Sequence, residues 1–496
     1  MTNFAQELTE AAADATDRPA VKLDDVVLTF GILDAAVARA AGMLRAKGVE
    51  AGDTVGLQMP NVPYFPIVYF GALRLGAVVV PMNPLLKGRE VNYHLSDSGA
   101  KVVVAWHDFA AAAQEGSEGA GAESVIAKPG EFEELLGGAD PVDEVVDRAD
   151  DDAAVIIYTS GTTGTPKGAT LMHSNIASGA EVARDLVDAG PDSVGLATLP
   201  LFHVFGMTSV MNMALHARAL MTLLPRFEPG KALEMIQRDR VTSFAGVPTM
   251  YSALLHQPER ENYDVSSLDL CVSGGSAMPV ELLRGFDDAF GAKVLEGYGL
   301  SETTGMGSFN LPDRERKPGS IGVPTGGTEM KVVDDNDNEL PQGERGEVVM
   351  RGPFVMKGYW NKPEATAEAM KGGWFHTGDI ATVDEDGYFF IVDRKKELVI
   401  RGGYNVYPRE IEEVLYSHPA VREAAVLGAP HDELGEEVAA AVVLKDGAEA
   451  TPQEIRDYVK QRVAAYKYPR MVWIADELPK TSTGKILKRE IEIPES

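Results

Sequence analysis

The sequence predicts an α/β fold in which parallel sheets are covered by helices, with a large N-terminal part and a smaller C-terminal part. Through residue 311, helical patterns alternate with short apolar runs rich in β-branched residues, which is typical of parallel sheets. From Gly319 onward, short strands and turns replace that alternation. The length of 496 residues exceeds that of one ordinary core, so we expect more than one domain.

The first 311 residues predict two parallel-sheet α/β subdomains. In the first, we expect helices at 34–47 and 65–75 and strands at 54–57, 78–81 and 101–105. Segment 110–122 is small and polar and segment 140–152 is strongly acidic, so both are expected to be exposed connections. The second α/β block spans residues 193–311.

The C-terminal third predicts two smaller units. Strands at 330–333, 347–351 and 388–392, with a turn at 334–338, indicate a small β-barrel or a distorted sheet. Past Lys396, a compact α+β piece with helices at 410–416 and 452–463 is expected. Polar residues 394–396 join two apolar strand candidates, which favours a hinge. We therefore predict an N-terminal domain over 1–393, a hinge at 394–396 and a mobile C-terminal domain over 397–496.

Composition excludes several classes of partner. The formal net charge of −29 repels nucleic acids and anionic membranes, so neither is expected as a partner. Cys271 is the only cysteine; it rules out an intrachain disulfide and lies in an apolar run that predicts burial. We find no signal-peptide pattern and no apolar run of about 20 residues, so we expect a cytoplasmic protein without a transmembrane segment. The oligomeric state, monomer or homodimer, stays open.

The most informative segment runs from Tyr158 to Gly168, directly after an apolar strand candidate. Its glycines allow backbone N–H groups to approach phosphate oxygens, its hydroxyls add donors, and Lys167 supplies positive charge. It is not a P-loop, because Lys167 follows Pro166 and precedes Gly168 instead of standing in Gly-Lys-Ser/Thr. Taken alone, the segment is also compatible with a polar hairpin turn.

Four further segments follow in order. Segment 297–302 (Gly-Tyr-Gly-Leu-Ser-Glu) offers an aromatic face, close backbone approach and a carboxylate, and segment 374–379 places an acid at a turn. Residues 393–397 (Asp-Arg-Lys-Lys-Glu) lead into a glycine pair, and segment 480–485 (Lys-Thr-Ser-Thr-Gly-Lys) lies near the C-terminus. These pieces supply the aromatic, acidic and basic groups that a nucleotide site requires.

Together these segments resemble the adenylate-forming (AMP-binding) superfamily, which includes acyl- and aryl-CoA synthetases, luciferases and the adenylation domains of peptide synthetases. The resemblance extends from about residue 20 to Arg489. It implies ATP, Mg²⁺ and CoA as cofactor and co-substrates, with a small carboxylic acid as the other partner. The implied nucleotide-binding residues are Thr159, Ser160, Gly161, Thr162, Thr163, Gly164, Lys167, Gly274, Gly275, Ser276, Glu296, Gly297, Tyr298, Gly299, Ser301, Asp379, Arg394, Lys396, Gly402 and Gly403.

Within that set, the resemblance implies individual roles. Glu302, with Thr159 nearby, binds Mg²⁺, while Tyr298 covers adenine and Ser301 reaches a phosphate. Asp379 and Arg394 hold the ribose. The residue types alone also allow Glu302 to be a surface acid, residues 274–276 a simple turn, and Arg394 a structural ion pair.

The resemblance also implies catalytic residues: Lys485, Glu302, Thr163 and His203. Lys485 would bridge the substrate carboxylate and the phosphate during adenylation, although a terminal polar loop could be merely exposed chain. His203 would lie at the acyl site, although periodicity alone suggests a core histidine. Rotation about Lys396 would exchange Lys485 for Gly402–Gly403, which would pass the pantetheine thiol.

The sequence therefore predicts an ATP-dependent acyl-CoA synthetase, an AMP-forming acid–thiol ligase. Medium- to long-chain fatty acids are favoured, partly by the apolar run Met207, Met211, Met213 and Leu215, although such a stripe is more often helix core. An aryl acid, as in coumarate-type ligases, is the alternative, as is a stand-alone enzyme that loads a carrier protein. Luciferase-type oxidation and a non-catalytic binding protein are less favoured.

Overall fold

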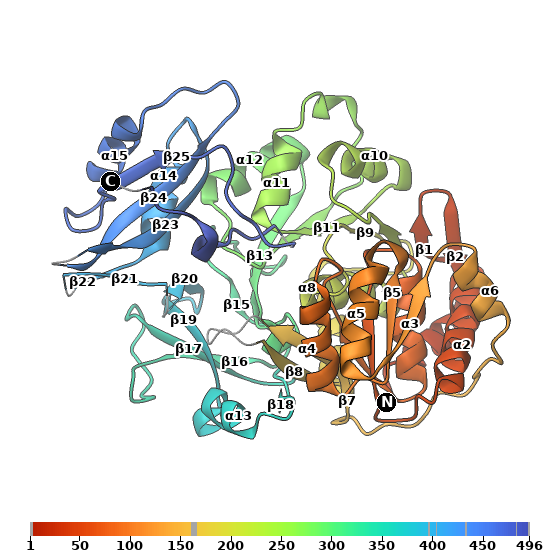
Figure 1. Cartoon of the computed structure of the whole chain (residues 1–496). Helices are drawn as coiled ribbons and strands as arrows, with labels where there is room; N and C mark the ends of the chain where they lie inside the picture. Colours follow the sequence, from red (N-terminus) through yellow and green to blue (C-terminus); the bar gives the residue numbers. More distant parts are fainter. Residues whose placement is uncertain are drawn as a thin grey trace.

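The computed structural model describes residues 3–159, 166–394, 397–402, 404–431, 434–482 and 484–494, with the backbone alone at 394. Four sheets organise these residues, two large and two small. In Figure 1 the red-to-yellow N-terminal residues and the green middle of the chain form the body, and the blue C-terminal residues form a separate lobe beside α12 and β13. The α/β class expected from the sequence is confirmed.

The first large sheet has seven strands in the order β18-β8-β7-β4-β3-β5-β6. Its central strands are parallel, whereas β8 and β18 add an antiparallel edge. The strands are β3 (Thr54–Gln58), β4 (Val78–Pro81), β5 (Val102–Trp106), β6 (Glu123–Ala127), β7 (Ala153–Thr159), β8 (Lys167–Met172) and β18 (Gly358–Tyr359). The helices of this region are α2 (Phe30–Ala46), α3 (Tyr64–Arg74), α4 (Gly88–Ser98), α5 (Ala110–Ala120) and α6 (Glu131–Gly137).

Helix α5 corrects the expectation of an exposed connection at 110–122. A side chain at Gly116 would place its Cβ 2.6 Å from Val91 on α4, so the small residues of α5 allow the two helices to pack closely. Ala113 is buried for the same reason. Segment 140–152 is irregular and largely exposed, as expected.

The second large sheet has nine strands in the order β15-β14-β13-β12-β11-β9-β10-β1-β2. Its inner strands, in the order β13, β12, β11, β9, β10 and β1, run parallel to their neighbours. Strand β2 at one end of the sheet, and β14 and β15 at the other end, pair antiparallel. The strands are β1 (Pro19–Leu23), β2 (Val26–Thr29), β9 (Val194–Ala197), β10 (Leu220–Leu223), β11 (Ser243–Gly246), β12 (Leu270–Ser273), β13 (Lys293–Tyr298), β14 (Ser308–Phe309) and β15 (Val323–Pro324). The associated helices are α1 (Gln6–Asp14), α7 (His173–Leu186), α8 (Val204–Gly206), the π-helical turn η2 (Met207–Asn212), α9 (Met213–His216), α10 (Pro229–Asp239), α11 (Pro248–Leu255) and α12 (Val280–Phe290).

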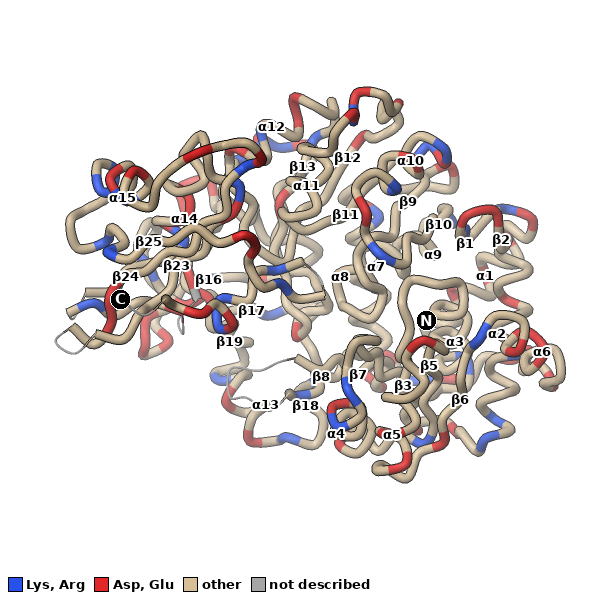
Figure 2. Tube along the Cα trace, turned by 45° about the horizontal axis from the view of Figure 1, so that its top comes forward, with Lys and Arg blue, Asp and Glu red and all other residues tan. Residues whose placement is uncertain are grey.

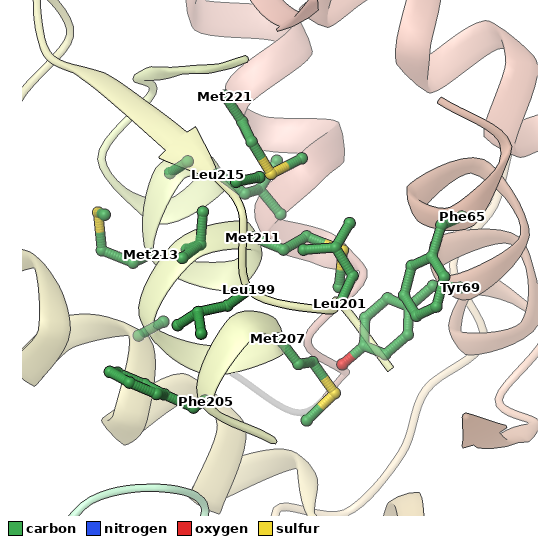
Figure 3. Packing of buried hydrophobic residues seen from close by; sticks show 14 of the residues in the cluster. Phe65, Tyr69, Leu199, Leu201, Phe205, Met207, Met211, Met213, Leu215 and Met221 are labelled. Atoms are coloured by element: carbon green, nitrogen blue, oxygen red, sulfur yellow. The ribbon is translucent and has the colours of Figure 1, made fainter. Parts of the chain in front are cut away.

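One hydrophobic cluster joins the two large sheets, and the methionine run belongs to it. Met207, Met211, Met213 and Leu215 are at most 5% exposed and belong to this cluster, in which Met207 lies beside Tyr69 (Figure 3). This run is therefore helix core, as its periodicity suggests. Cys271 is buried as predicted, and burial raises the pKa of its thiol to about 12.

A third, four-stranded sheet is antiparallel in the order β16-β17-β19-β20. Its strands are β16 (Glu329–Val333), β17 (Gly346–Arg351), β19 (Phe375–Val383) and β20 (Phe389–Arg394), and α13 (Pro363–Ala369) lies between β18 and β19. The register of β19 shifts against both neighbours. The strand path is open, which matches the distorted-sheet alternative better than a closed barrel.

The C-terminal residues form a five-stranded sheet with two helices and a hydrophobic core of their own. The strands are β21 (Val399–Arg401), β22 (Tyr404–Val406), β23 (Val421–His431), β24 (Gly435–Leu444) and β25 (Met471–Ile474), and the helices are α14 (Pro408–Tyr416) and α15 (Pro452–Lys460). This lobe has the mixture of helices and strands, α+β, that the sequence indicates. The domain limits and the hinge stay predictions.

The distribution of acidic residues and the apolarity of the helices bear on the expectations from composition. Acidic residues recur along the whole chain and do not gather over one element (Figure 2). Within the described ranges, none of the helices has both the length and the apolarity needed to span a membrane.

Candidate active site

An open cleft with a cavity volume of about 240 Å³ is lined by residues of the nine-stranded sheet, the four-stranded sheet and the C-terminal lobe. The body contributes the ends of β12 and β13 together with β19, and the lobe contributes α14 and the loop around Lys485. Eight predicted site residues line this cleft: Gly275, Ser276, Glu296, Gly297, Tyr298, Gly299, Asp379 and Lys485. Motifs that are far apart in the sequence therefore meet at one place.

The ends of β12 and β13 form the floor of the cleft. Because these strands are parallel neighbours, their carboxyl ends lie at the same edge of the sheet. Gly275 adopts a φ of 78°, which favours glycine, and a Cβ at Gly297 would lie 2.1 Å from the Phe309 ring. Gly274 lies beneath, where a Cβ would approach the Phe205 ring at 3.2 Å. The glycines are thus required by close packing, which keeps the backbone accessible from the cleft.

Tyr298 and Asp379 form a direct pair across the cleft. The Tyr298 hydroxyl donates to Asp379 Oδ2 at 2.5 Å, and Asp379 is buried. Arg394 faces Asp379 across the β19–β20 ladder, although its side chain lies outside the described atoms. An aromatic ring beside a carboxylate offers one surface for a base and one acceptor for sugar hydroxyls.

Glu296 is the most perturbed acid of the cleft. It is 1% exposed, its Oε1 accepts the backbone N–H of Met278 at 3.0 Å, and its Oε2 has no partner among the described protein atoms. Burial raises the pKa of Glu296 to about 7, although the charge of Arg409 opposes that shift. The carboxyl therefore holds the 274–278 loop by its backbone and changes charge near neutral pH.

The phosphate-loop residues Ser160, Gly161, Thr162, Thr163 and Gly164 lie outside the described residues, but the stem of the loop is defined. Thr159 ends β7 and Lys167 begins β8, and the two are antiparallel partners. Glu302 follows in the short 3₁₀-helix η4 (Ser301–Thr303). The Thr159 hydroxyl donates to Glu302 Oε1 at 3.4 Å, so the predicted metal pair is in contact.

Tyr359 is a residue that the sequence did not single out. Its hydroxyl donates to Glu302 Oε1 at 2.9 Å. Burial and then the charge of Glu302 raise the pKa of Tyr359 above its ordinary value, so the phenol remains a hydrogen-bond donor. Only the paired Gly-Tyr before a tryptophan could have drawn attention to it, and that dipeptide carries no chemistry by itself.

The metal site has few protein ligands. The described residues contain no group of three His, Cys, Asp or Glu side chains that could enclose an ion. Glu302 and Thr159 nevertheless offer one carboxylate and one hydroxyl oxygen at the stem of the phosphate loop. Mg²⁺ commonly binds through one or two carboxylates while substrate phosphates and water complete its shell, so these residues fit Mg²⁺ bound together with a nucleotide.

Lys485 reaches the cleft on a loop that contacts the body. The Gly484 carbonyl accepts the Thr249 hydroxyl at 3.0 Å, and Asn83 Nδ2 donates to Ser482 Oγ at 3.0 Å. Gly484 adopts a φ of 82°, and a Cβ there would lie 2.7 Å from Thr249 Oγ1. Glycine therefore permits both the turn and the close approach that present Lys485.

His203 lies near Lys485 but does not line the cleft itself. Its Nδ1 accepts the backbone N–H of Phe205 at 3.2 Å, which caps α8. Burial, and then the positive charge of Lys485, lower the pKa of His203 to about 4. The ring is therefore neutral at pH 7.

Gly402, the described member of the glycine pair, does not line the cleft. Gly402 follows β21 at a φ of 55°, donates its N–H to the Leu434 carbonyl at 2.8 Å and is not a residue of the cleft. Gly403 and Lys396 lie outside the described residues. In this arrangement the cleft contains Lys485 and not Gly402.

Arg409, on α14, is a second residue that the sequence did not single out. Its guanidinium donates to the Ile391 carbonyl at 2.6 Å and to the Gly319 carbonyl at 3.2 Å, and its backbone N–H donates to Asp393 at 3.1 Å. It therefore joins the lobe to the body at the edge of the cleft. One arginine in an amphipathic helix gives no sequence signal for this role.

Comparison with known proteins agrees with this geometry. The AMP-binding enzyme model matches residues 8–360, and the AMP-binding enzyme C-terminal domain matches residues 410–485. The chain belongs to the AMP-binding enzyme family. It is an acyl-CoA synthetase by type, an AMP-forming acid–CoA ligase.

Relatives in this family differ in substrate. The chain is 38% identical to a long-chain-fatty-acid–CoA ligase of Bacillus subtilis (strain 168), over 98% of the chain and 93% of the relative. It is 39% identical to a feruloyl-CoA synthase of an Amycolatopsis species, over 95% of each. Among solved structures, ATP-bound MatB from Rhodopseudomonas palustris is 34% identical, with a TM-score of 0.92 over 99% of this chain and 98% of MatB.

Proposed function

We propose that this acid–CoA ligase activates a fatty acid of medium to long chain in two steps. The acid and ATP first give an acyl-adenylate and pyrophosphate, and CoA then gives the thioester and AMP. One observation carries the proposal: Lys485 lines the same cleft as the Tyr298–Asp379 pair, and Leu300 of that cleft stands two residues before Glu302, which contacts the stem of the phosphate loop.

The first step requires a carboxylate to attack the α-phosphate of ATP while pyrophosphate leaves. Two anions must approach each other, so positive charge and alignment lower the barrier. Lys485 supplies that charge between the reacting groups, and residues 160–165 and Lys167 hold the β- and γ-phosphates. Mg²⁺, held by Glu302 with Thr159, would neutralise the phosphates.

The nucleoside end of ATP is assigned to the other side of the cleft. Tyr298 stacks on adenine, and the backbone of residues 274–276 and 297–299 lines its edge. Asp379 and Arg394 hold the ribose hydroxyls, which is supported by their facing positions on β19 and β20. Neutral His203, close to Lys485, lines the position of the substrate carboxylate without competing for positive charge.

The second step requires a different face of the lobe. Rotation about Lys396 would withdraw Lys485 and bring Gly402–Gly403 to the adenylate, where the absence of side chains leaves room for pantetheine. The separate positions of Lys485 and Gly402 support this proposal. The thiol then attacks the acyl carbonyl and AMP leaves.

The identity of the carboxylic acid substrate is assigned separately from the two steps of the reaction. The loop after β12 lines the cleft, and Val272 within β12 lines a second, small pocket with apolar side chains of η2, α9 and β11. That pocket holds only about 20 Å³, which is too small for an alkyl chain, so the support for a fatty acid comes from the Bacillus relative. The feruloyl-CoA synthase at similar identity supports an aryl acid as the second candidate.

The deciding experiment measures pyrophosphate release with aliphatic acids of graded length and with aryl acids, each with and without CoA. We expect release to depend on the acid, with the highest kcat/KM for medium- to long-chain fatty acids, and thioester to form only with CoA. A preference for hydroxycinnamic acids would replace the fatty-acid assignment. Adenylate formation without transfer to CoA would indicate carrier loading instead.

A further inference from the structure

Strand β18 crosses from the region of the four-stranded sheet to the first large sheet. It pairs with β8, where Gly358 faces Thr170 and Tyr359 faces Ala169. The next residue, Trp360, donates its backbone N–H to the Gly168 carbonyl at 2.7 Å. This short strand therefore fixes Tyr359 beside the end of the phosphate loop, although 191 residues separate Tyr359 from Gly168.

Tyr359 contacts charged groups on two sides. Its hydroxyl donates to Glu302 Oε1 at 2.9 Å, the same oxygen that the Thr159 hydroxyl approaches at 3.4 Å. The Lys167 ammonium lies 5.1 Å from the centre of the Tyr359 ring, within the range of a cation–π contact. One side chain thus touches the predicted metal carboxylate and the predicted phosphate lysine.

The segment that carries Tyr359 is anchored by a second set of polar contacts. Lys362 forms an ion pair with Asp97 at 2.6 Å, and Asp97 also accepts the Tyr158 hydroxyl at 2.8 Å. Tyr93 donates to the Pro166 carbonyl at 2.7 Å. Helix α4 therefore ties both ends of the phosphate loop and the β18 segment into one unit, which restricts the position of Tyr359.

We propose that Tyr359 is a positioning residue that sets the orientation of the Glu302 carboxylate for magnesium-bound ATP. This inference rests on the proposed function. A carboxylate on an exposed helix end rotates freely, whereas one oxygen held by a phenol and a threonine hydroxyl leaves the other oxygen directed for an ion. Supporting groups of this kind commonly change metal affinity 10- to 100-fold.

The test compares Tyr359→Phe with Tyr388→Phe. Both changes remove one hydroxyl from a partly or fully buried ring, and Tyr388 donates to the Glu315 carbonyl at 2.5 Å outside the cleft. Calorimetry measures ATP binding with and without Mg²⁺. We expect Tyr359→Phe to weaken binding about 10-fold with Mg²⁺ and to leave metal-free binding unchanged, whereas Tyr388→Phe should change neither. Equal weakening in both conditions would overturn the proposal.

A double-mutant cycle with Glu302→Gln tests the route of the effect. If Tyr359 acts through the Glu302 carboxylate, Tyr359→Phe should cause little further loss of magnesium-dependent ATP binding in the Glu302→Gln protein. Additive losses would show that the tyrosine acts elsewhere. Melting temperatures of all variants identify simple loss of the fold.

The two proposals fail in different ways. If the wild type releases no pyrophosphate with any acid, the proposed function is wrong, yet calorimetry still decides whether Tyr359 governs magnesium-dependent nucleotide binding. If the wild type is active and Tyr359→Phe retains normal magnesium-dependent binding, the inference about Tyr359 alone is wrong.

Discussion

The predicted phosphate side, at the stem of loop 160–165, and the lysine side, at the cleft, are built in different ways. On the phosphate side, Thr159, Glu302 and Tyr359 come from distant segments of the body and share one carboxylate oxygen. On the other side, the lobe presents Lys485 on a loop whose side-chain contacts with the body include Asn83–Ser482 and Thr249–Gly484. The phosphate side is held by contacts within the body, whereas the lysine side is held by contacts between the lobe and the body, those of Arg409 included, which a rotation of the lobe would have to break.

This difference suggests different roles for the phosphate side of the body and for the C-terminal lobe. Under the proposed function, a fixed phosphate side would keep ATP, and later the adenylate, in place through both half-reactions. A docked lobe would offer one face for adenylation and another for thioester formation, and Gly402 lies away from the cleft that contains Lys485. We therefore expect substitutions on the lobe to separate the half-reactions and substitutions on the body to affect nucleotide binding.

The largest effect is expected from Lys485→Ala. Under the proposed function, its ammonium would be the positive group between the carboxylate and the α-phosphate, so adenylation should fall about 10²- to 10³-fold. Thioester formation from pre-made acyl-adenylate should change little. Rapid-quench measurement of each half-reaction checks this, with exposed Lys460→Ala as the control. Equal loss in both half-reactions would make Lys485 a structural residue.

Glu302→Gln should have the next largest effect. The amide keeps the shape but loses the charge that would hold Mg²⁺, so adenylation should fall about 10²-fold. The fold should remain intact by circular dichroism, and exposed Glu385→Gln should behave as wild type. Near-normal turnover of Glu302→Gln would remove this residue from the metal site.

Gly402→Val tests the second face of the lobe. The side chain would obstruct the pantetheine path, so transfer to CoA should fall about 10-fold or more while adenylation is retained. Backbone strain is controlled by Gly447→Val, because both glycines adopt a positive φ, 55° and 73°, and belong to the same lobe. If both variants lose transfer equally, strain and not the thiol path explains the effect.

The smallest effect concerns the pH dependence of stability. The pKa of Glu296 is raised from 4.5 to about 7, so its ionisation destabilises the folded state. The stability that the neutral carboxyl gives is complete below pH 4.5 and is lost as pH rises through about 7. That loss is on the order of 3 kcal/mol. Glu296→Gln keeps the acceptor for Met278 and should raise the melting temperature more at pH 8 than at pH 5; an equal change at both values would contradict this.

Sequence reasoning reached the parts of this structure that depend on local chemistry. Strand and helix positions followed from periodicity, and the cleft residues Tyr298, Asp379 and Lys485 followed from the family resemblance that segments 297–302, 374–379 and 480–485 carry. Helix α5 was missed because small residues resemble a loop until the partner helix is known. The sequence left open whether the methionine run lines an acyl site or forms helix core. Its packing in the structure places the run in the core.

Two site residues, Tyr359 and Arg409, were not predicted from the sequence for a different reason. Tyr359 and Arg409 act through contacts with segments remote in sequence: Tyr359 reaches Glu302 because β18 pairs with β8, and Arg409 reaches backbone carbonyls of the body. Neither contact leaves a periodic or motif-level signal. The roles carried over for all of the site residues stay predictions, and residues 160–165, Lys396 and Gly403 also lie outside the described part of the chain.

We propose that Lys485 acts in the cleft during adenylation and that Gly402–Gly403 replace it there during thioester formation. Asn83 and Ser482 contact each other at 3.0 Å across the docked loop, and the natural cysteine, Cys271, is buried. An Asn83→Cys, Ser482→Cys protein joined by a short bismaleimide would hold the lobe in the docked position. The unlinked double variant and each single variant treated with the reagent are the controls.

Single-turnover measurement of the linked protein gives the decisive result. We expect the linked protein to form acyl-adenylate from acid and ATP at a rate close to that of the unlinked protein, but no longer to transfer the acyl group from the adenylate to CoA. If the linked protein formed the thioester as fast as the unlinked one, both half-reactions would occur with the lobe docked, and the claim would be wrong.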